Sequence, residues 1–177
     1  MIDIHWEQKS SKLSCHYAWQ PGWAGTISVI AVPEDIRQEV HLETLMSSNA
    51  SQAKTINCSK LTPGRRYRIL CRMGESEIPL EKECIFVVPY NVQVNYFPGK
   101  LRKDGWQEIF IRVQGVLPSG SLAINRGSGY KFPLPLQPKA NEICRYWFQV
   151  ESEDQAKLSC LVPVKASPKL VHSIKEL

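Results

Sequence analysis

The sequence predicts an all-β chain made of two tandem β-sandwich modules. Apolar and polar residues alternate with period two in many short runs, which is typical of strands with one buried face. The 12 Pro and 10 Gly residues are spread along the chain, as expected where turns join many short strands. The pattern of runs also restarts near the middle of the 177 residues, a length that suits two small domains.

The first module is predicted over residues 1–89. Its strands are expected at residues 2–6, 13–19, 26–32, 54–58, 66–73 and 83–88, with turns at 21–25 and 74–80 and a polar loop at 47–52. Residues 36–46 fit either a pair of strands or one to two helical turns, so both alternatives stay open. Within 66–73, Tyr67, Ile69 and Cys71 alternate with positions that are mostly arginine, which places them on the core side.

One turn between two of these strands carries the most specific pattern in the chain. Pro63 fixes φ and Gly64 permits a positive φ, so the pair marks a turn after Leu61. Tyr67 enters the next strand directly afterwards, where its ring can be buried and its hydroxyl can hydrogen-bond to the turn backbone. This arrangement is the tyrosine corner of Greek-key sandwiches.

This corner, together with Leu13–Pro21 upstream, resembles a fibronectin type III domain. The resemblance covers residues 1–89, and Trp19 stands in the place of the core tryptophan. It implies a Greek-key sandwich of the fibronectin III or immunoglobulin-like kind. It does not imply a particular function, because domains of this fold serve many different functions.

The second module is predicted over residues 90–166, followed by a tail or short helix at 167–177. Four of its runs, at 92–96, 108–113, 117–124 and 157–163, echo runs of the first module in the same order. This order indicates a diverged internal duplication, in which 157–163 corresponds to the last strand of the first module. Tyr146 is expected on the strand that corresponds to that of Tyr67, but Pro-Gly is missing before it. The second copy is therefore a generic immunoglobulin-like sandwich or lacks the corner.

The six cysteines permit three interpretations. Residues equidistant from a hairpin turn face each other, which predicts that Cys71 faces Cys84 and that Cys144 faces Cys160. The thiols can be reduced and packed as small apolar groups, or they can form disulfides in an exported protein. In the second case the resemblance to immunoglobulin-type domains implies a rival pairing of Cys15 with Cys71. A zinc site is the third interpretation, although the sequence has no C-x-x-C spacing.

Charge and motifs narrow the classes of function. The net charge is +5 and the basic residues are scattered, so a nucleic-acid partner is not expected. No apolar run approaches the roughly 20 residues of a membrane span, and the N-terminus has no signal-peptide pattern. The chain as given is expected to be cytoplasmic, or extracellular if it is a fragment of a longer protein. Metal, phosphate-binding and nucleophile motifs are missing from the sequence, so we expect no cofactor, no metal and no enzyme activity.

The tryptophans are the candidate binding residues. Trp23 and Trp106 lie in predicted turns, and Trp147 is expected to face away from the core. An exposed Trp can anchor a protein contact or stack on a sugar, although a turn Trp can also fold back over its own sandwich. The sequence therefore favours a non-catalytic interaction or spacer module with a protein partner. The alternative is a carbohydrate-binding accessory module of a polysaccharide-degrading enzyme, and the oligomeric state stays open.

Overall fold

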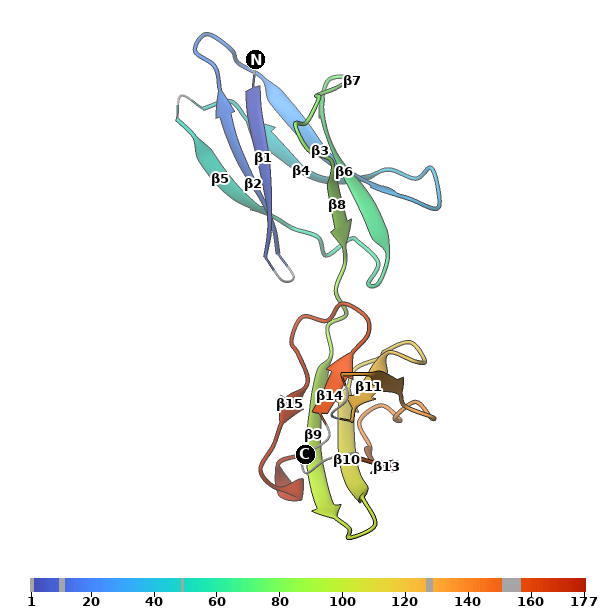
Figure 1. Ribbon diagram of the computed structural model, residues 1–177. Helices are drawn as coiled ribbons and strands as arrows, with labels where there is room; N and C mark the ends of the chain where they lie inside the picture. Colours follow the sequence, from blue (N-terminus) through green and yellow to red (C-terminus); the bar gives the residue numbers. More distant parts are fainter. Residues whose placement is uncertain (1, 10–11, 49, 127–128, 151–156) are drawn as a thin grey trace. The chain divides into compact units, whose positions relative to one another are not determined.

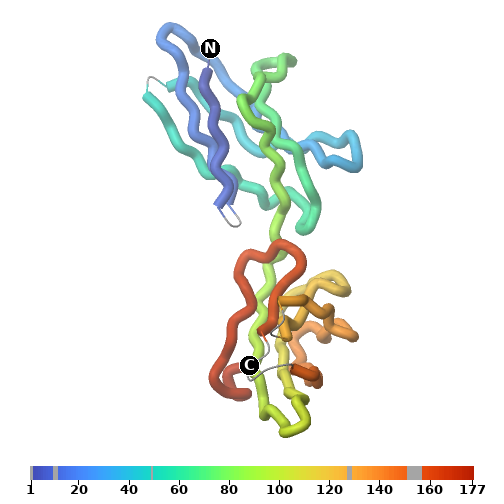
Figure 2. Tube along the Cα trace, in the orientation of Figure 1, coloured from blue at the N-terminus to red at the C-terminus, as the bar shows by residue number. Residues whose placement is uncertain are grey.

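The computed structural model describes residues 2–9, 12–48, 50–126, 129–150 and 157–177. These residues form β-strands joined by turns, with a single short 3-10 helix among them, so the chain is all-β as predicted. The chain divides into two compact units, Met1–Val88 and Pro89–Leu177 (Figures 1 and 2). No helix in the described part of the chain is long and apolar enough to cross a membrane.

The first unit contains two antiparallel sheets. One sheet has the order β1-β2-β5, with β1 at Ile2–Lys9, β2 at Lys12–Trp19 and β5 at Gln52–Ile56. The other has the order β4-β3-β6-β7, with β4 at Val40–Met46, β3 at Thr26–Pro33, β6 at Arg66–Met73 and β7 at Ser76–Glu77. Strand β8, at Cys84–Val87, also pairs with β6. The ambiguous segment 36–46 therefore contains one strand, β4, and no helix.

The two sheets of the first unit enclose one apolar core. The alternate residues Leu13, Cys15, Tyr17 and Trp19 of β2 are buried, and so are Tyr67, Ile69 and Cys71 of β6. All seven belong to one cluster of packed residues, which confirms the predicted inward face of β6 and the core position of Trp19. Burying apolar side chains from two facing sheets is the main source of stability in a sandwich of this kind.

The predicted corner hydrogen bond is present in the first unit. The ring of Tyr67 is 2% exposed, and its hydroxyl accepts a hydrogen bond of 3.0 Å from the backbone N–H of Thr62. Gly64 has a φ of 79°, the positive value that its turn requires. Its N–H donates to the carbonyl of Val88 at 2.7 Å, which ties the turn to the end of the unit.

The second unit also contains two sheets. One has the order β13-β10-β9-β15, with β13 at Ile143–Gln149, β10 at Trp106–Gln114, β9 at Gln93–Leu101 and β15 at Lys169–Leu170. The other has the order β12-β11-β14, with β12 at Lys131–Pro133, β11 at Leu122–Asn125 and β14 at Lys157–Cys160. Its buried residues form a separate core cluster.

Strands β1–β6 of the first unit pair in the same pattern as strands β9–β14 of the second unit. The order β1-β2-β5 corresponds to β9-β10-β13, and β4-β3-β6 corresponds to β12-β11-β14. Strand β13, which carries Tyr146, therefore takes the place of β5 and not the predicted place of β6. The run 157–163 likewise begins with β14 in the place of β6, so its predicted match to the last strand of the first unit is wrong.

The predicted cysteine pairs do not face each other. Cys84 lies opposite Ile69, while Cys71 lies opposite Val29 on β3. In the second unit, Cys144 is on β13 and Cys160 is on β14, and these strands belong to different sheets. All six cysteines are free thiols.

The end of the chain is part of the second unit. Strand β15 pairs in parallel with β9, and the N–H of Val171 donates to the carbonyl of Tyr96 at 3.0 Å. The 3-10 helix η1 spans Ile174–Glu176, and Leu177 beyond it is buried. Of the predicted tail or short helix at 167–177, only the one-turn η1 is helical, and the tail begins with β15.

Candidate binding surfaces

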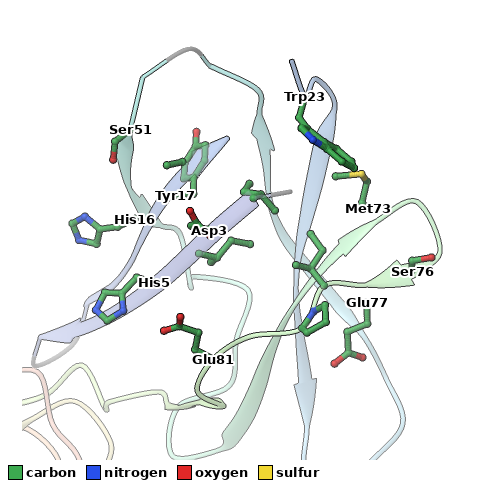
Figure 3. A pocket seen from close by; sticks show the side chains of 15 residues that line it. Asp3, His5, His16, Tyr17, Trp23, Ser51, Met73, Ser76, Glu77 and Glu81 are labelled. Carbon is green, nitrogen blue, oxygen red and sulfur yellow. The ribbon is translucent and has the colours of Figure 1, made fainter. Parts of the chain in front are cut away.

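A groove runs along the outer edge of β1 in the first unit. It has a volume of about 750 Å³, within the usual range for ligand-binding pockets. One wall is formed by residues 2–5 of β1 with neighbours from β2, and the opposite wall by residues 76–79 and Glu81. Figure 3 shows these two walls, with Asp3, His5 and His16 on one side and Ser76 and Glu77 on the other.

The wall opposite β1 exists because the last strand of the first unit is interrupted. Strand β7 pairs Glu77 with Arg72, and a regular continuation would place Leu80 opposite Ile69. Cys84 takes that position, so residues 78–83 loop away from β6. The N–H of Ile78 donates to the carbonyl of Cys71 at 2.8 Å, but Pro79 has no N–H and cannot continue the ladder. We call residues 78–83 the bulged segment.

Trp23 lies at one end of the groove. It belongs to the turn between β2 and β3, where its N–H donates to the carbonyl of Gln20 at 3.1 Å. The side chain lines the groove beside Met73 and is 55% exposed, so it does not fold back completely over its own sandwich (Figure 3). An exposed indole next to a thioether gives this end of the groove an apolar, adaptable surface.

The groove has an apolar interior and an acidic rim. Ile2, Ile4, Ile78 and Pro79 line it together with Trp23 and Met73. Its charged side chains are the carboxylates of Asp3, Glu77 and Glu81, and none of the described lining residues is Lys or Arg. The sign of this local charge is opposite to the net charge of +5 of the whole chain.

The cation that lies opposite Glu77, Arg72, already has another carboxylate partner. Arg72 lies opposite Glu77 in the β6–β7 pair, but its guanidinium donates to both carboxylate oxygens of Glu39 at 2.7 Å. This bidentate pair with Glu39 raises the pKa of Arg72. The charge of Glu77 also contributes to raising the pKa of Arg72, so this rim carboxylate interacts with the same cation, while Asp3 and Glu81 are not among the causes.

A second candidate surface lies on the outer face of β10 and β13. Trp147 is 39% exposed, as predicted, and the guanidinium groups of Arg102 and Arg145 lie 5.4 Å and 5.1 Å from its ring centre. Arg145 also forms an ion pair with Glu108 on the neighbouring strand. The indole is therefore covered by cations at distances typical of cation–π contacts.

Trp106 begins β10 on the same sheet, two residues before Glu108. Its N–H donates to the side chain of Asp104 in the preceding turn at 3.3 Å, and its side chain is 40% exposed. Among the described residues, the close ring pairs are Phe97 with Phe110 and Tyr146 with Phe148. Trp23 belongs to the other unit.

The thiols of the first unit lie in its core. Burial, with a smaller contribution from neighbouring thiols, raises the pKa of Cys15 and Cys71 to about 12. Burial also raises the pKa of Cys58 and Cys84 to about 11. Thiols that stay protonated are poor nucleophiles and poor metal ligands. No group of three or more His, Cys, Asp or Glu within the described ranges is arranged to hold a metal ion.

Sequence reasoning identified Trp23 as a candidate but missed the groove itself. The missing parts were the open edge of β1 and the bulged segment. Pro79, in the predicted turn just before the last strand, was the available signal, because a proline cannot donate to a strand ladder and so indicates a break in pairing. In comparisons with known proteins, no protein-family description matches the chain, and no curated protein matches it.

Proposed function

We propose that the chain is a non-catalytic tandem of two fibronectin III or immunoglobulin-like sandwiches that binds a protein partner through the groove beside β1. The family assignment is supported by the two-sheet arrangement of each unit and by the hydrogen bond between Tyr67 and Thr62 at the predicted corner. The observation that carries the binding function is the groove, which joins apolar side chains to an exposed strand edge.

A protein segment fits this groove better than other ligands. Protein segments bind to sheet edges through main-chain hydrogen bonds and place side chains in adjoining pockets. The groove offers a strand edge along residues 2–5 of β1 and an apolar anchor point at Trp23 and Met73. Large exposed aromatic side chains are also the residues that most often dominate the binding energy of protein interfaces.

Glycan binding has less support. Sugars stack on the open faces of aromatic rings, and Arg102 and Arg145 lie over the ring of Trp147. Trp23 is the more open candidate, but it lies beside the side chain of Met73 and the strand edge rather than beside a second coplanar ring (Figure 3).

The test is selection of ligands from a displayed library of random linear peptides on the whole chain. Selected peptides are then titrated against the wild type, Trp23→Ala and the matched control Trp106→Ala. Removing an interface aromatic costs about 1–3 kcal/mol, so we expect Trp23→Ala to weaken binding about tenfold or more. Trp106→Ala should bind within twofold of the wild type.

Two results would contradict the proposal. One is the absence of any saturable peptide ligand. The other is a set of ligands that bind Trp23→Ala as tightly as the wild type, since these would use a different surface. Amide spectra of each variant establish that the fold is retained.

A further inference from the structure

We infer that the groove of the first unit takes an extended, basic peptide, which adds as a strand to β1. Apolar side chains of the peptide enter the groove, and Lys or Arg side chains between them meet the acidic rim. This inference rests on the proposed function and specifies its partner. Four features of the first unit carry it: the regularity of β1, the space beside β1, the bulged segment and the charge of the rim.

Strand β1 is the longest regular edge of the first unit. Within the described residues it pairs only with β2, in an uninterrupted register that runs over 8 residues from Ile2 with Trp19 to Lys9 with Lys12. Alternate residues of such an edge strand direct their N–H and C=O groups away from the sheet. Unpaired groups of this kind are the template on which a further strand can form.

The other edges of the first unit are less suited to strand addition. Strand β4 pairs with β3 through a register shift at Val29 and Ile30, and bulges of this kind disrupt an edge. Strand β8 has only 4 residues. Strand β5 has 5 residues and carries Lys54 at its centre, a residue type that blunts sheet edges. In contrast, β1 contains no proline and no irregularity in its pairing.

The bulged segment leaves the space that an added strand needs. Neighbouring strands lie about 4.8 Å apart, so a peptide paired with β1 would run through the groove. Residues 2–5 of β1 line this space, and four residues of an extended chain span roughly 13 Å. On the opposite wall, the N–H of Ile78 is already bonded to Cys71 and Pro79 has none to offer. The peptide backbone therefore pairs with β1 and contacts the bulged segment through side chains.

The rim selects the charge of the peptide. Asp3 stands on the β1 wall, while Glu77 and Glu81 stand on the opposite wall, and all three are exposed. Arg72, opposite Glu77, donates its hydrogen bonds to Glu39 and feels the charge of Glu77 as well, so Asp3 and Glu81 are the carboxylates that chiefly favour a basic peptide. Side chains of an extended peptide alternate between two faces, so one face can be apolar while the other presents Lys or Arg to these carboxylates. An acidic peptide would meet three like charges at the same positions.

The first experiment compares synthetic peptides on the whole chain. One peptide alternates Val and Lys over eight residues, a second alternates Val and Glu, and a third is the Val-Lys peptide with backbone N-methylation at alternate residues. We expect the Val-Lys peptide to bind at least about tenfold more tightly than either of the others. Amide hydrogen exchange should slow for alternate residues of β1 when it binds.

The second experiment changes the rim. The double variant Asp3→Lys, Glu81→Lys should bind the Val-Lys peptide at least about tenfold more weakly and should gain affinity for the Val-Glu peptide. The matched control is Glu34→Lys, Glu75→Lys, which makes the same charge change in the same unit at exposed residues outside the groove and outside the bulged segment. This control should bind the Val-Lys peptide within about threefold of the wild type.

The outcomes separate this inference from the proposed function. Suppose that library peptides require Trp23. The inference is then overturned, while the proposed function stands, if these peptides have no preference for Lys and Arg, if β1 amides are not protected on binding, or if N-methylation has no effect. If no peptide requires Trp23, both fail. If β1 amides become protected by raising the concentration of the protein alone, the occupant is a second copy of the chain, and the inference is overturned.

Discussion

The hydroxyl of Tyr67 offers the sharpest test of how the first unit is held together. Tyr67→Phe keeps the buried ring and removes the hydroxyl that accepts the 3.0 Å hydrogen bond from the Thr62 N–H and that also interacts with Arg65. Leaving a buried donor without a partner costs about 1–3 kcal/mol. Thr62 is itself an exposed residue, so water can reach part of the turn. We therefore expect a loss of about 1–2 kcal/mol in the free energy of unfolding of the first unit.

Tyr146→Phe provides a comparison in the second unit. The hydroxyl of Tyr146 donates to the carbonyl of Leu136 at 3.0 Å, so its removal leaves an acceptor and not a donor without a partner. Carbonyl groups tolerate a missing partner better than N–H groups, and Leu136 is 74% exposed. The expected loss is about 0.5–1 kcal/mol. Tyr130→Phe, at a ring that is 71% exposed, is the control and should change the stability by less than about 0.5 kcal/mol.

The assay must report on each unit separately. Urea unfolding of the whole chain, followed through resolved amide resonances of both units, gives one midpoint and one slope for each. A loss of 1 kcal/mol in a unit of this size corresponds to about 4–8 °C in its melting temperature. The reasoning is refuted if Tyr67→Phe unfolds with the wild-type midpoint, or if it loses no more stability than Tyr130→Phe.

Two further predictions concern the thiols and one turn. The pKa values of Cys15 and Cys71 are raised from 9.0 to about 12, so the folded unit retains protons that the unfolded chain releases. The contribution of these protonated thiols to the free energy of unfolding is therefore complete below pH 9 and is lost as the pH rises through about 12. Above pH 9, each thiol should lower the free energy of unfolding of the first unit by about 1.4 kcal/mol per pH unit. Urea unfolding at pH 8, 9 and 10 should therefore show a shallower decline for Cys71→Ala than for the wild type. An identical decline in the two proteins would contradict the assignment. Gly115 has a φ of 103°, and an added Cβ would lie 2.9 Å from Cγ1 of Val92, so Gly115→Ala should destabilise the second unit by about 2–4 kcal/mol. Gly120→Ala, at a φ of 75° with no atom within 4 Å of the added Cβ, should cost only about 1 kcal/mol, and equal losses for the two variants would show that crowding at Val92 is unimportant.

Local patterns were sufficient to predict the all-β class, many of the strands and the corner. The alternation in β6 identified its inward residues, because a strand places successive side chains on opposite faces. Pro63, Gly64 and Tyr67 identified the corner, because each acts on the backbone within a few residues. The exposed position of Trp147 followed from the same alternation within β13.

Pairing between distant strands could not be predicted in the same way. The expected facing of Cys71 and Cys84 assumed one continuous hairpin, and the bulged segment, which contains Pro79, breaks it. Cys144 and Cys160 lie on consecutive strands, yet these strands join different sheets. A period-two pattern tells which face of a strand is buried but not which neighbour it pairs with. The groove depends on how distant strands pair, so the sequence identified only one of its lining residues, Trp23.

The parallel pairing of the first and last segments of the second unit has a mechanical consequence. Tyr90 bridges to Val164, and β9 pairs with β15, so the entering and leaving chains run side by side in the same direction. A force that pulls residues 89 and 177 apart would slide these segments past each other and would load their hydrogen bonds together. In the first unit, the described residues of β1 pair with β2 alone, which gives no such clamp. In single-molecule stretching, the first unit, which has the open edge at β1, should therefore unfold at lower force than the second unit.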